Sequence, residues 1–281
     1  SKKRAENWGI KVPDDDSQVM YVWYDALTNY ISALDYGGED SISNASSLFN
    51  THWVNADKIS HVIGKGINRF HSIYWPSMLL AAGLRTPDTI FVHGYLTVNG
   101  EKISKSLGNV IDPVNIINKY GSIALRYYLL KAFSPFEDGD FREEKLIETY
   151  NSDLANNIGN LVKRVETIGE RSNYIIKYTK DFSFPKDFEL FMNEFKFNEA
   201  INYILTISSD LNREFEIQKP WLALKEGKYE ITHNFLDKII DRYFMVLNML
   251  CLFIPTLKNE LTIRYEDQKH MKTAQSLFPK I

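Results

Sequence analysis

The sequence contains a single cysteine among 281 residues and no apolar run long enough for a membrane helix. Cys251 alone can form neither an intrachain disulfide nor a multi-cysteine zinc site, which excludes disulfide-rich and zinc-finger classes. We expect it to be a buried thiol. The most apolar stretch, YFMVLNMLCLFIP, is shorter than the ~20 residues that span a bilayer, and SKKRAENWGI at the start has no apolar signal core. These absences predict a cytoplasmic protein with no membrane partner.

The sequence also lacks a dominant sign of charge, because 33 Lys and Arg oppose 36 Asp and Glu, for a formal net charge of -3. A nucleic-acid partner would therefore need a local basic surface. The content of 44% hydrophobic and 25% charged residues is that of a globular protein, which excludes disordered and collagen-like classes. The length exceeds the ~150 residues of a typical domain, so we expect two domains.

The first third of the chain alternates short apolar runs with amphipathic stretches, a pattern typical of βα units and a largely parallel sheet. We predict strands over 19–23, 59–63, 89–92 and 95–98, and helices over 25–34 and 68–82. The last of these strands ends in Asn99-Gly100, which favours a tight hairpin turn. Asp112-Pro113 then predicts the N-cap and first residue of a helix.

The stretch SPFEDG, residues 134–139, is turn-forming, and only helical periodicity follows it. We place the domain boundary here, with an α/β domain over 1–136 and an all-α helical bundle over 137–281. The predicted bundle helices cover 143–171, 187–215, 220–226 and 231–253.

Three groups of residues could bind ligands. GEKISKSLGN, residues 100–109, could hold a polyphosphate, because lysine and serine side chains and loop amides suit phosphate and the flanking glycines allow closure. Two aromatic stripes could meet beyond the carboxyl ends of neighbouring parallel strands. One stripe is Ile67, His71 and Trp75, and the other is Trp23, Ala26 or Leu27, and Tyr30. Asn160 and Arg164 share a helix face, and with Trp221 they could bind splayed bases. From the residues alone, each group also has a structural alternative. Residues 100–109 could be a solvated polar loop, the two aromatic stripes could be core faces, and Asn160 and Arg164 could lie on a solvated helix face.

VNGEKISKSLGNVIDP resembles the KMSKS signature of class I aminoacyl-tRNA synthetases, with Ile103 where the family more often has Met. YVWYDALTNYISAL and HVIGKGINRFHSIYWPSMLLAAGL are similar to segments of methionyl-tRNA synthetases in particular. The likeness continues through VHGYLTVNG, NSDLANNIGNLVKR and QKPWLALK, and it spans about Trp8 to Ile281. It implies the second half of a Rossmann-type parallel-sheet catalytic domain, followed by an all-α anticodon-binding domain.

The resemblance also implies a role for each group. Lys102 and Lys105 would be catalytic. ATP, accompanied by Mg²⁺, would contact His93, Gly94, Lys102, Ser104, Lys105 and Ser106. The methionine side chain would contact Trp23, Ala26, Leu27, Tyr30, Ile67 and His71, with a hydrogen bond to its sulfur available from Tyr30 or His71. The anticodon of tRNA(Met) would contact Asn160, Arg164 and Trp221. Trp75 could be pocket wall or core, and we expect His61 to be structural with a backbone partner.

The implied reaction activates methionine with ATP to methionyl-adenylate and then transfers it to tRNA(Met). Three features depart from the family. Gly66 stands where many relatives have an acidic residue, no H-x-G-H string occurs, and no CxxC occurs, so we expect no zinc site in this chain. We therefore expect a C-terminal fragment that is inactive alone. The alternatives are another class I synthetase, of the Leu, Ile or Val group, a non-catalytic tRNA-binding module, or a structural scaffold. The oligomeric state stays open, with a monomer favoured.

Overall fold

The computed structural model describes residues 8–37, 47–103, 108–178, 182–266 and 276–281. The chain forms two compact units, Ser1–His93 and Gly94–Ile281. It is a mixed α/β protein that is mostly helical. The boundary predicted after residue 136 concerns the division between a catalytic and an anticodon-binding part, and it stays a prediction.

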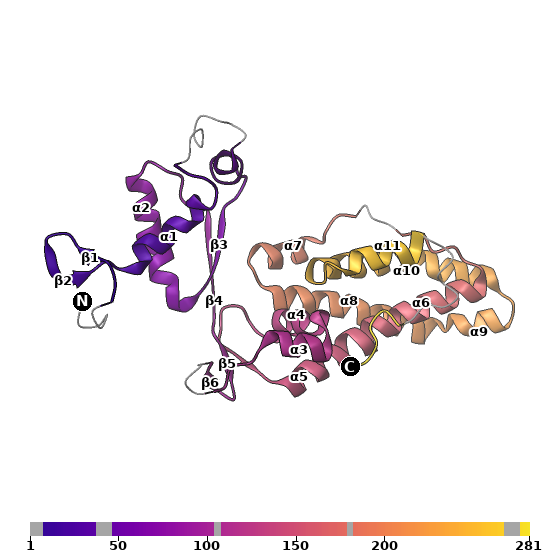
Figure 1. The fold of residues 1–281 in the computed structure, drawn as a ribbon. Helices are drawn as coiled ribbons and strands as arrows, with labels where there is room; N and C mark the ends of the chain where they lie inside the picture. Colours follow the sequence, from indigo (N-terminus) through magenta and orange to yellow (C-terminus); the bar gives the residue numbers. More distant parts are fainter. Residues whose placement is uncertain (1–7, 38–46, 104–107, 179–181, 267–275) are drawn as a thin grey trace. The chain divides into compact units, whose positions relative to one another are not determined.

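The first unit combines two small sheets with helices (Figure 1). Its elements are β1 (Lys11–Val12), β2 (Asp15–Val19), α1 (Val22–Ser32), the π-helical turn η1 (Asn50–Val54), β3 (Ser60–Gly64), the 3₁₀ turn η2 (Lys65–Ile67), the π-helical turn η3 (Phe70–Tyr74), α2 (Trp75–Ala81) and β4 (Thr89–His93). Strands β3 and β4 pair in parallel, from Ser60 opposite Thr89 to Gly64 opposite His93. This pair confirms the strands predicted over 59–63 and 89–92.

The strand predicted over 19–23 is wrong. Strand β2 ends at Val19 and pairs antiparallel with β1, and helix α1 begins at Val22. Leu27 and Ile31, one helical turn apart, bury their side chains, and Asp25 lies in the first turn of the helix, where a negative charge is favourable. Helical burial therefore prevails over the strand propensity of the Val and aromatic residues at the start of this stretch.

The core of the first unit lies between its helices and the β3–β4 pair. It consists of Leu27, Ile31, Phe49, Trp53, Ile59, Trp75 and Leu79. The helix predicted over 68–82 is confirmed as a helical segment that contains η3 and α2 and ends before Gly83, whose φ is +70°, and η2 precedes it. Pro76 lies at the start of α2 and cannot donate a backbone hydrogen bond, and the wider π turn directly precedes it.

The second unit begins with a three-stranded sheet of order β6-β5-β7. Its strands are β5 (Leu96–Val98), β6 (Glu101–Lys102) and β7 (Gly139–Phe141). Asn99 and Gly100 have φ values of +55° and +77°, which confirms the predicted hairpin turn. Strand β7 pairs in parallel with β5 and was not predicted, because DGDF has two aspartates, which are poor strand formers.

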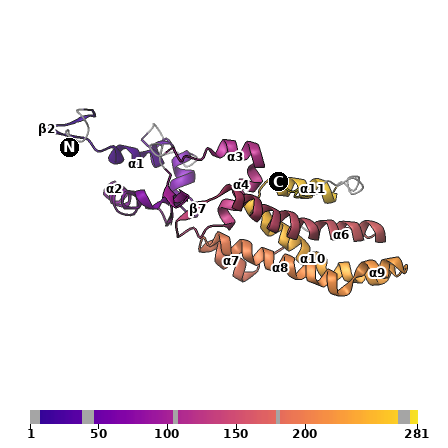
Figure 2. The same ribbon diagram turned by 90° about the horizontal axis from the view of Figure 1, so that it is seen from below.

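The rest of the second unit is helical, and the helices from α5 onward agree with the helical periodicity predicted from residue 143 (Figure 2). Its helices are α3 (Pro113–Tyr120), α4 (Ser122–Lys131), α5 (Glu143–Thr149), the π-helical η5 (Tyr150–Ile158), α6 (Gly159–Ser172), α7 (Lys186–Asn193), α8 (Phe197–Gln218), α9 (Pro220–Lys225), α10 (Tyr229–Phe253) and α11 (Leu257–Glu266). Asp112 caps α3 by accepting a hydrogen bond from Val114 N, at 2.8 Å. The helix predicted over 187–215 is divided at Phe195, whose φ is +59°, and α11 was not predicted.

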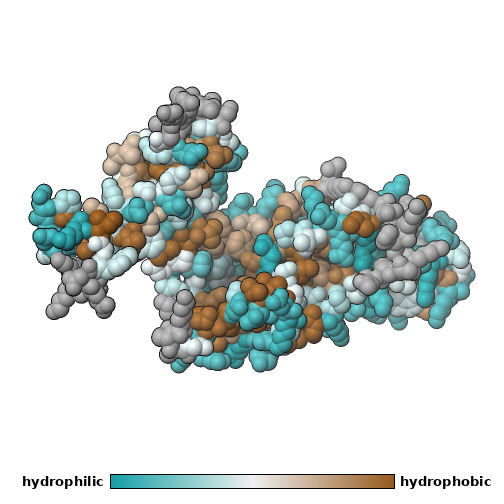
Figure 3. Space-filling model, viewed as in Figure 1, coloured by the Kyte–Doolittle hydropathy of each residue, from teal (hydrophilic) through white to brown (hydrophobic). Residues whose placement is uncertain are grey.

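Cys251 is half-buried, and burial raises its pKa to about 11. On the face shown in Figure 3, apolar and polar residues are interspersed. No helix within the described ranges is long and apolar enough to cross a membrane.

Candidate functional site

The two aromatic stripes meet in the first unit. His71 Nδ1 donates to the carbonyl of Ile67, at 3.0 Å, which leaves Nε2 as an acceptor. The Tyr30 hydroxyl on α1 donates to this nitrogen, at 2.8 Å. The Trp23 ring contacts the edge of His71 with centroids 5.8 Å apart. Four of the six predicted methionine-binding residues are therefore joined by direct contacts.

Both hydrogen-bond donors in this arrangement are already engaged. The Tyr30 proton points to His71, and the His71 proton points to the Ile67 carbonyl. A ligand sulfur would receive a hydrogen bond only after one of these bonds is released. Burial raises the pKa of Tyr30, so its hydroxyl keeps its proton.

His61 forms the inner layer of the same cluster. Its Nε2 accepts a hydrogen bond from the Trp75 indole nitrogen, at 3.1 Å, and its ring lies 4.2 Å from that of Tyr30. Burial and the nearby His71 lower the pKa of His61 to about 4. His61 is buried, and its partner is an indole rather than the expected backbone group, while its structural role stays a prediction. Trp75 is 1% exposed and belongs to the core.

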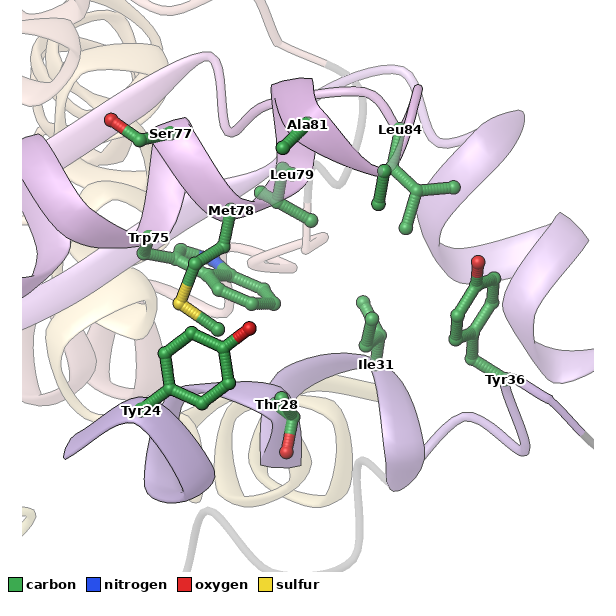
Figure 4. Close-up of a pocket in the computed structure, with 11 residues that line it drawn as sticks. Tyr24, Thr28, Ile31, Tyr36, Trp75, Ser77, Met78, Leu79, Ala81 and Leu84 are labelled. Atoms are coloured by element: carbon green, nitrogen blue, oxygen red, sulfur yellow. The ribbon is translucent and has the colours of Figure 1, made fainter. Parts of the chain in front are cut away.

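Two neighbouring cavities lie beside these aromatic residues, and their linings share Tyr24, Ser77 and Met78. The first, of about 450 Å³, lies between α1 and α2, and its labelled lining includes none of the six predicted residues (Figure 4). The second, of about 620 Å³, contains Trp23 and Leu27 in its lining and is bordered by Phe70, on which Trp23 stacks with centroids 4.6 Å apart. The second cavity therefore fits the predicted side-chain pocket better. Ala26 is exposed and lines neither cavity.

His93 and Gly94 end β4 and begin the second unit. Gly94 N donates to the carbonyl of Pro135, at 3.0 Å. A Cβ atom on Gly94 would lie only 1.9 Å from the carbonyl oxygen of Glu137. Gly94 therefore permits a close backbone approach by the turn over 134–139.

The lysine–serine segment follows the β5–β6 hairpin. The backbone of Lys102 lies in β6 opposite Thr97. Ser104, Lys105 and Ser106 lie outside the described residues, so their predicted roles stay predictions.

The three residues predicted to read an anticodon line one pocket of the second unit. This pocket, of about 360 Å³, is lined by Asn160, Lys163, Arg164, Thr167, Ile168, Arg171, Phe215 and Trp221. Asn160 is exposed and Trp221 is half-buried, so both present surface to a ligand. Lys163 and Arg171 join Arg164 in this lining. The pocket is therefore locally basic although the net charge of the chain is negative.

Arg164 has partners that the sequence did not reveal. Its guanidinium forms an ion pair with Glu216 and donates to the side-chain oxygen of Asn212, at 3.3 Å. Both partners lie on α8, about fifty residues away in sequence. An acidic residue on an amphipathic helix does not indicate by its sequence position which distant residue it will contact.

No group of three or more His, Cys, Asp or Glu residues in the described part of the chain is arranged to hold a metal ion.

Residues 1–166 match the family model described as tRNA synthetases class I (M). The methionine–tRNA ligase of Thermotoga maritima is 40% identical, over 90% of this chain and 41% of that protein. The methionine–tRNA ligase of Rickettsia conorii is 36% identical, over 97% of this chain and 54% of that protein. The chain thus spans about half the length of the curated relatives it matches.

Solved structures give the same relationship. The structure of Mycobacterium tuberculosis methionyl-tRNA synthetase in complex with methionyl-adenylate aligns with a TM-score of 0.76 at 29% identity, over 97% of this chain and 58% of that one. The free-state structure from the same organism aligns with a TM-score of 0.75 at 26% identity, over 98% of this chain and 58% of that one.

Proposed function

We propose that this chain, which belongs to the class I tRNA synthetases of the methionyl group, works in the methionine–tRNA ligase reaction. In this reaction ATP activates methionine to methionyl-adenylate with release of pyrophosphate, and tRNA(Met) then receives the methionyl group. The chain would contribute the second half of a Rossmann-type catalytic domain and the helical anticodon-binding domain.

The contact of Trp23 and Tyr30 with His71 carries the proposal. It places aromatic surface beside a cavity of about 620 Å³. An unbranched thioether side chain makes favourable contacts with aromatic rings, whereas the branched aliphatic side chains of leucine, isoleucine and valine lack the sulfur that gains from them. Leu27 would close the pocket with an apolar wall, since it is 1% exposed. This chemistry favours methionine over leucine, isoleucine or valine.

Lys102 and Lys105 would act on ATP, which brings Mg²⁺ with it. As the methionine carboxylate attacks the α-phosphorus and pyrophosphate leaves, negative charge shifts along the phosphate chain. Ammonium groups at that position stabilise the transition state, and one such contact is typically worth about 3 kcal/mol. Ser104, Ser106 and the backbone of His93 and Gly94 would complete the ATP contacts.

The pocket of Asn160, Arg164 and Trp221 would receive the anticodon. An indole and a guanidinium plane can stack on unpaired bases, while amide and guanidinium groups hydrogen-bond base edges. A non-catalytic tRNA-binding module would use this pocket alone, which is the second candidate function.

Amino-acid-dependent exchange of pyrophosphate into ATP tests the proposal. The natural full-length protein should exchange with methionine and remain at background with leucine, isoleucine or valine. Exchange with one of these three instead would contradict the methionine assignment. Tight tRNA(Met) binding without exchange by the full-length protein would favour the binding module. We expect no exchange from the 281-residue chain alone.

A further inference from the structure

The β5–β6 hairpin, residues 96–102, is held to the second unit mainly by polar bonds. Leu96 is 38% exposed, and Thr97 and Val98 are only half-buried. Strand β6 has two residues and, among the strands of the described ranges, lies at the edge of the sheet beside β5. Because the hairpin buries little apolar surface, its orientation depends on the few hydrogen bonds that reach it from β7.

The Asp140 side chain on β7 supplies the bonds that reach the turn of this hairpin. Its Oδ1 accepts from Gly100 N at 2.8 Å and from the Thr97 hydroxyl at 3.0 Å. Its Oδ2 accepts from Arg142 Nε at 2.8 Å. The hydrogen bond from Gly100, followed by that from Arg142, lowers the pKa of Asp140, so the carboxylate stays ionised.

The chain that follows Asp140 is anchored in the core of the second unit. Phe141 and Leu146, on either side of Arg142, are buried in the core of the second unit. Arg142 N also donates to the Tyr128 hydroxyl, at 3.4 Å. Helix α5 begins at Glu143, and η5 and α6 continue it without a break to Ser172. Asp140 therefore links the hairpin turn to the start of the helix that carries Asn160 and Arg164.

We propose that Asp140 is a positioning residue of the synthetase, whose carboxylate fixes the Asn99–Gly100 turn and so aims the hairpin that carries Lys102. The role rests on the proposed function. Asp140 acts through the hairpin and contacts no substrate itself. A displacement of about 1 Å in a reacting group is enough to cost on the order of a hundredfold in rate, so loss of this anchor has a measurable effect.

The test compares Asp140→Ala and Asp140→Asn with a matched control, Glu148→Gln, in the natural full-length protein. Glu148 is an exposed carboxylate on α5 that pairs with Lys145. The substitution Glu148→Gln therefore removes the same charge as Asp140→Asn without changing a contact of the hairpin. Asparagine keeps an oxygen that can accept from Gly100 and Thr97. The measurements are kcat and KM in methionine-dependent exchange, thermal unfolding, and hydrogen exchange at the Gly100 amide.

Asp140→Ala should speed hydrogen exchange at Gly100 and lower kcat by about tenfold or more, with the KM for methionine unchanged within about twofold. Asp140→Asn should restore most of kcat, and Glu148→Gln should match the wild type. An unchanged kcat in an Asp140→Ala protein would overturn the positioning role alone. A parallel loss of kcat, methionine binding and thermal stability would also overturn it, because that result describes a purely structural residue. A wild type without methionine-dependent exchange would instead overturn the proposed function, and the role with it.

Discussion

The Tyr30 hydroxyl donates a hydrogen bond to His71 Nε2 across 2.8 Å, and this bond joins α1 to the π-helical turn η3. His71 is 1% exposed, so its nitrogen has no alternative partner in bulk water. The bond fixes the relative position of the two elements that carry the proposed methionine pocket.

Tyr30→Phe should leave a buried acceptor unsatisfied on His71. We expect the free energy of unfolding to fall by about 1–2 kcal/mol, and the KM for methionine in the exchange reaction to rise. Urea unfolding and exchange kinetics of the natural full-length protein measure the two effects. Tyr24→Phe is the control for stability, because Tyr24 is 72% exposed. Equal stability in the two variants would show that the Tyr30–His71 bond contributes nothing net.

His61 should make stability depend on pH. Its pKa in the folded state is about 4, below the ordinary value of about 6.5, so the unfolded state binds more protons between these values. The contribution is fully present above pH 6.5 and is lost as the pH falls toward 4, by roughly 2–3 kcal/mol.

The His61 contribution is isolated by comparing the wild type with His61→Gln at several pH values, because the acidic groups titrate in both proteins. Glutamine keeps an oxygen that can accept from Trp75. The difference in unfolding free energy between the two proteins should shrink from pH 7 to pH 4.5. A difference independent of pH would contradict the depressed pKa of His61.

Gly94→Ala should destabilise the second unit. The new Cβ atom would lie 1.9 Å from the Glu137 carbonyl oxygen, and backbone cannot yield as a flexible side chain can. We expect a loss of about 2–3 kcal/mol in urea unfolding. Gly64→Ala is the control, since its Cβ would make only an ordinary contact of 3.6 Å with His93. Similar losses in both variants would argue against a steric cause at Gly94.

In the natural full-length protein, Trp221→Ala should weaken binding of tRNA(Met) while leaving methionine activation intact. Stacking on one base is worth about 1–3 kcal/mol, so the dissociation constant should rise by roughly 10- to 100-fold. Filter binding measures it, and circular dichroism checks that the half-buried indole is not needed for folding. Trp221→Phe should retain most of the affinity. Trp8→Ala, which removes an indole that is 84% exposed, should bind like the wild type.

Local sequence signals were sufficient for the parts of this protein that depend on neighbouring residues. Apolar runs located the parallel strands β3 and β4, and Asn99-Gly100 located the hairpin turn through its positive φ values. Helical periodicity located the bundle, and motif likeness located the family. Each strand, turn and helix among these features is encoded by consecutive residues, and the family likeness rests on several such stretches in order along the chain.

The tertiary structure decided the features that depend on distant partners. Residues 19–23 suit a strand by propensity, but burial of Leu27 and Ile31 makes the stretch from Val22 helical. Strand β7 forms because β5 is available to pair with it. Asp140 meets Gly100 from 40 residues away, and Glu216 meets Arg164 from 52 residues away. Periodicity and propensity describe which face of an element is apolar, whereas the partner of a single carboxylate is set only when the packed core brings separate elements together.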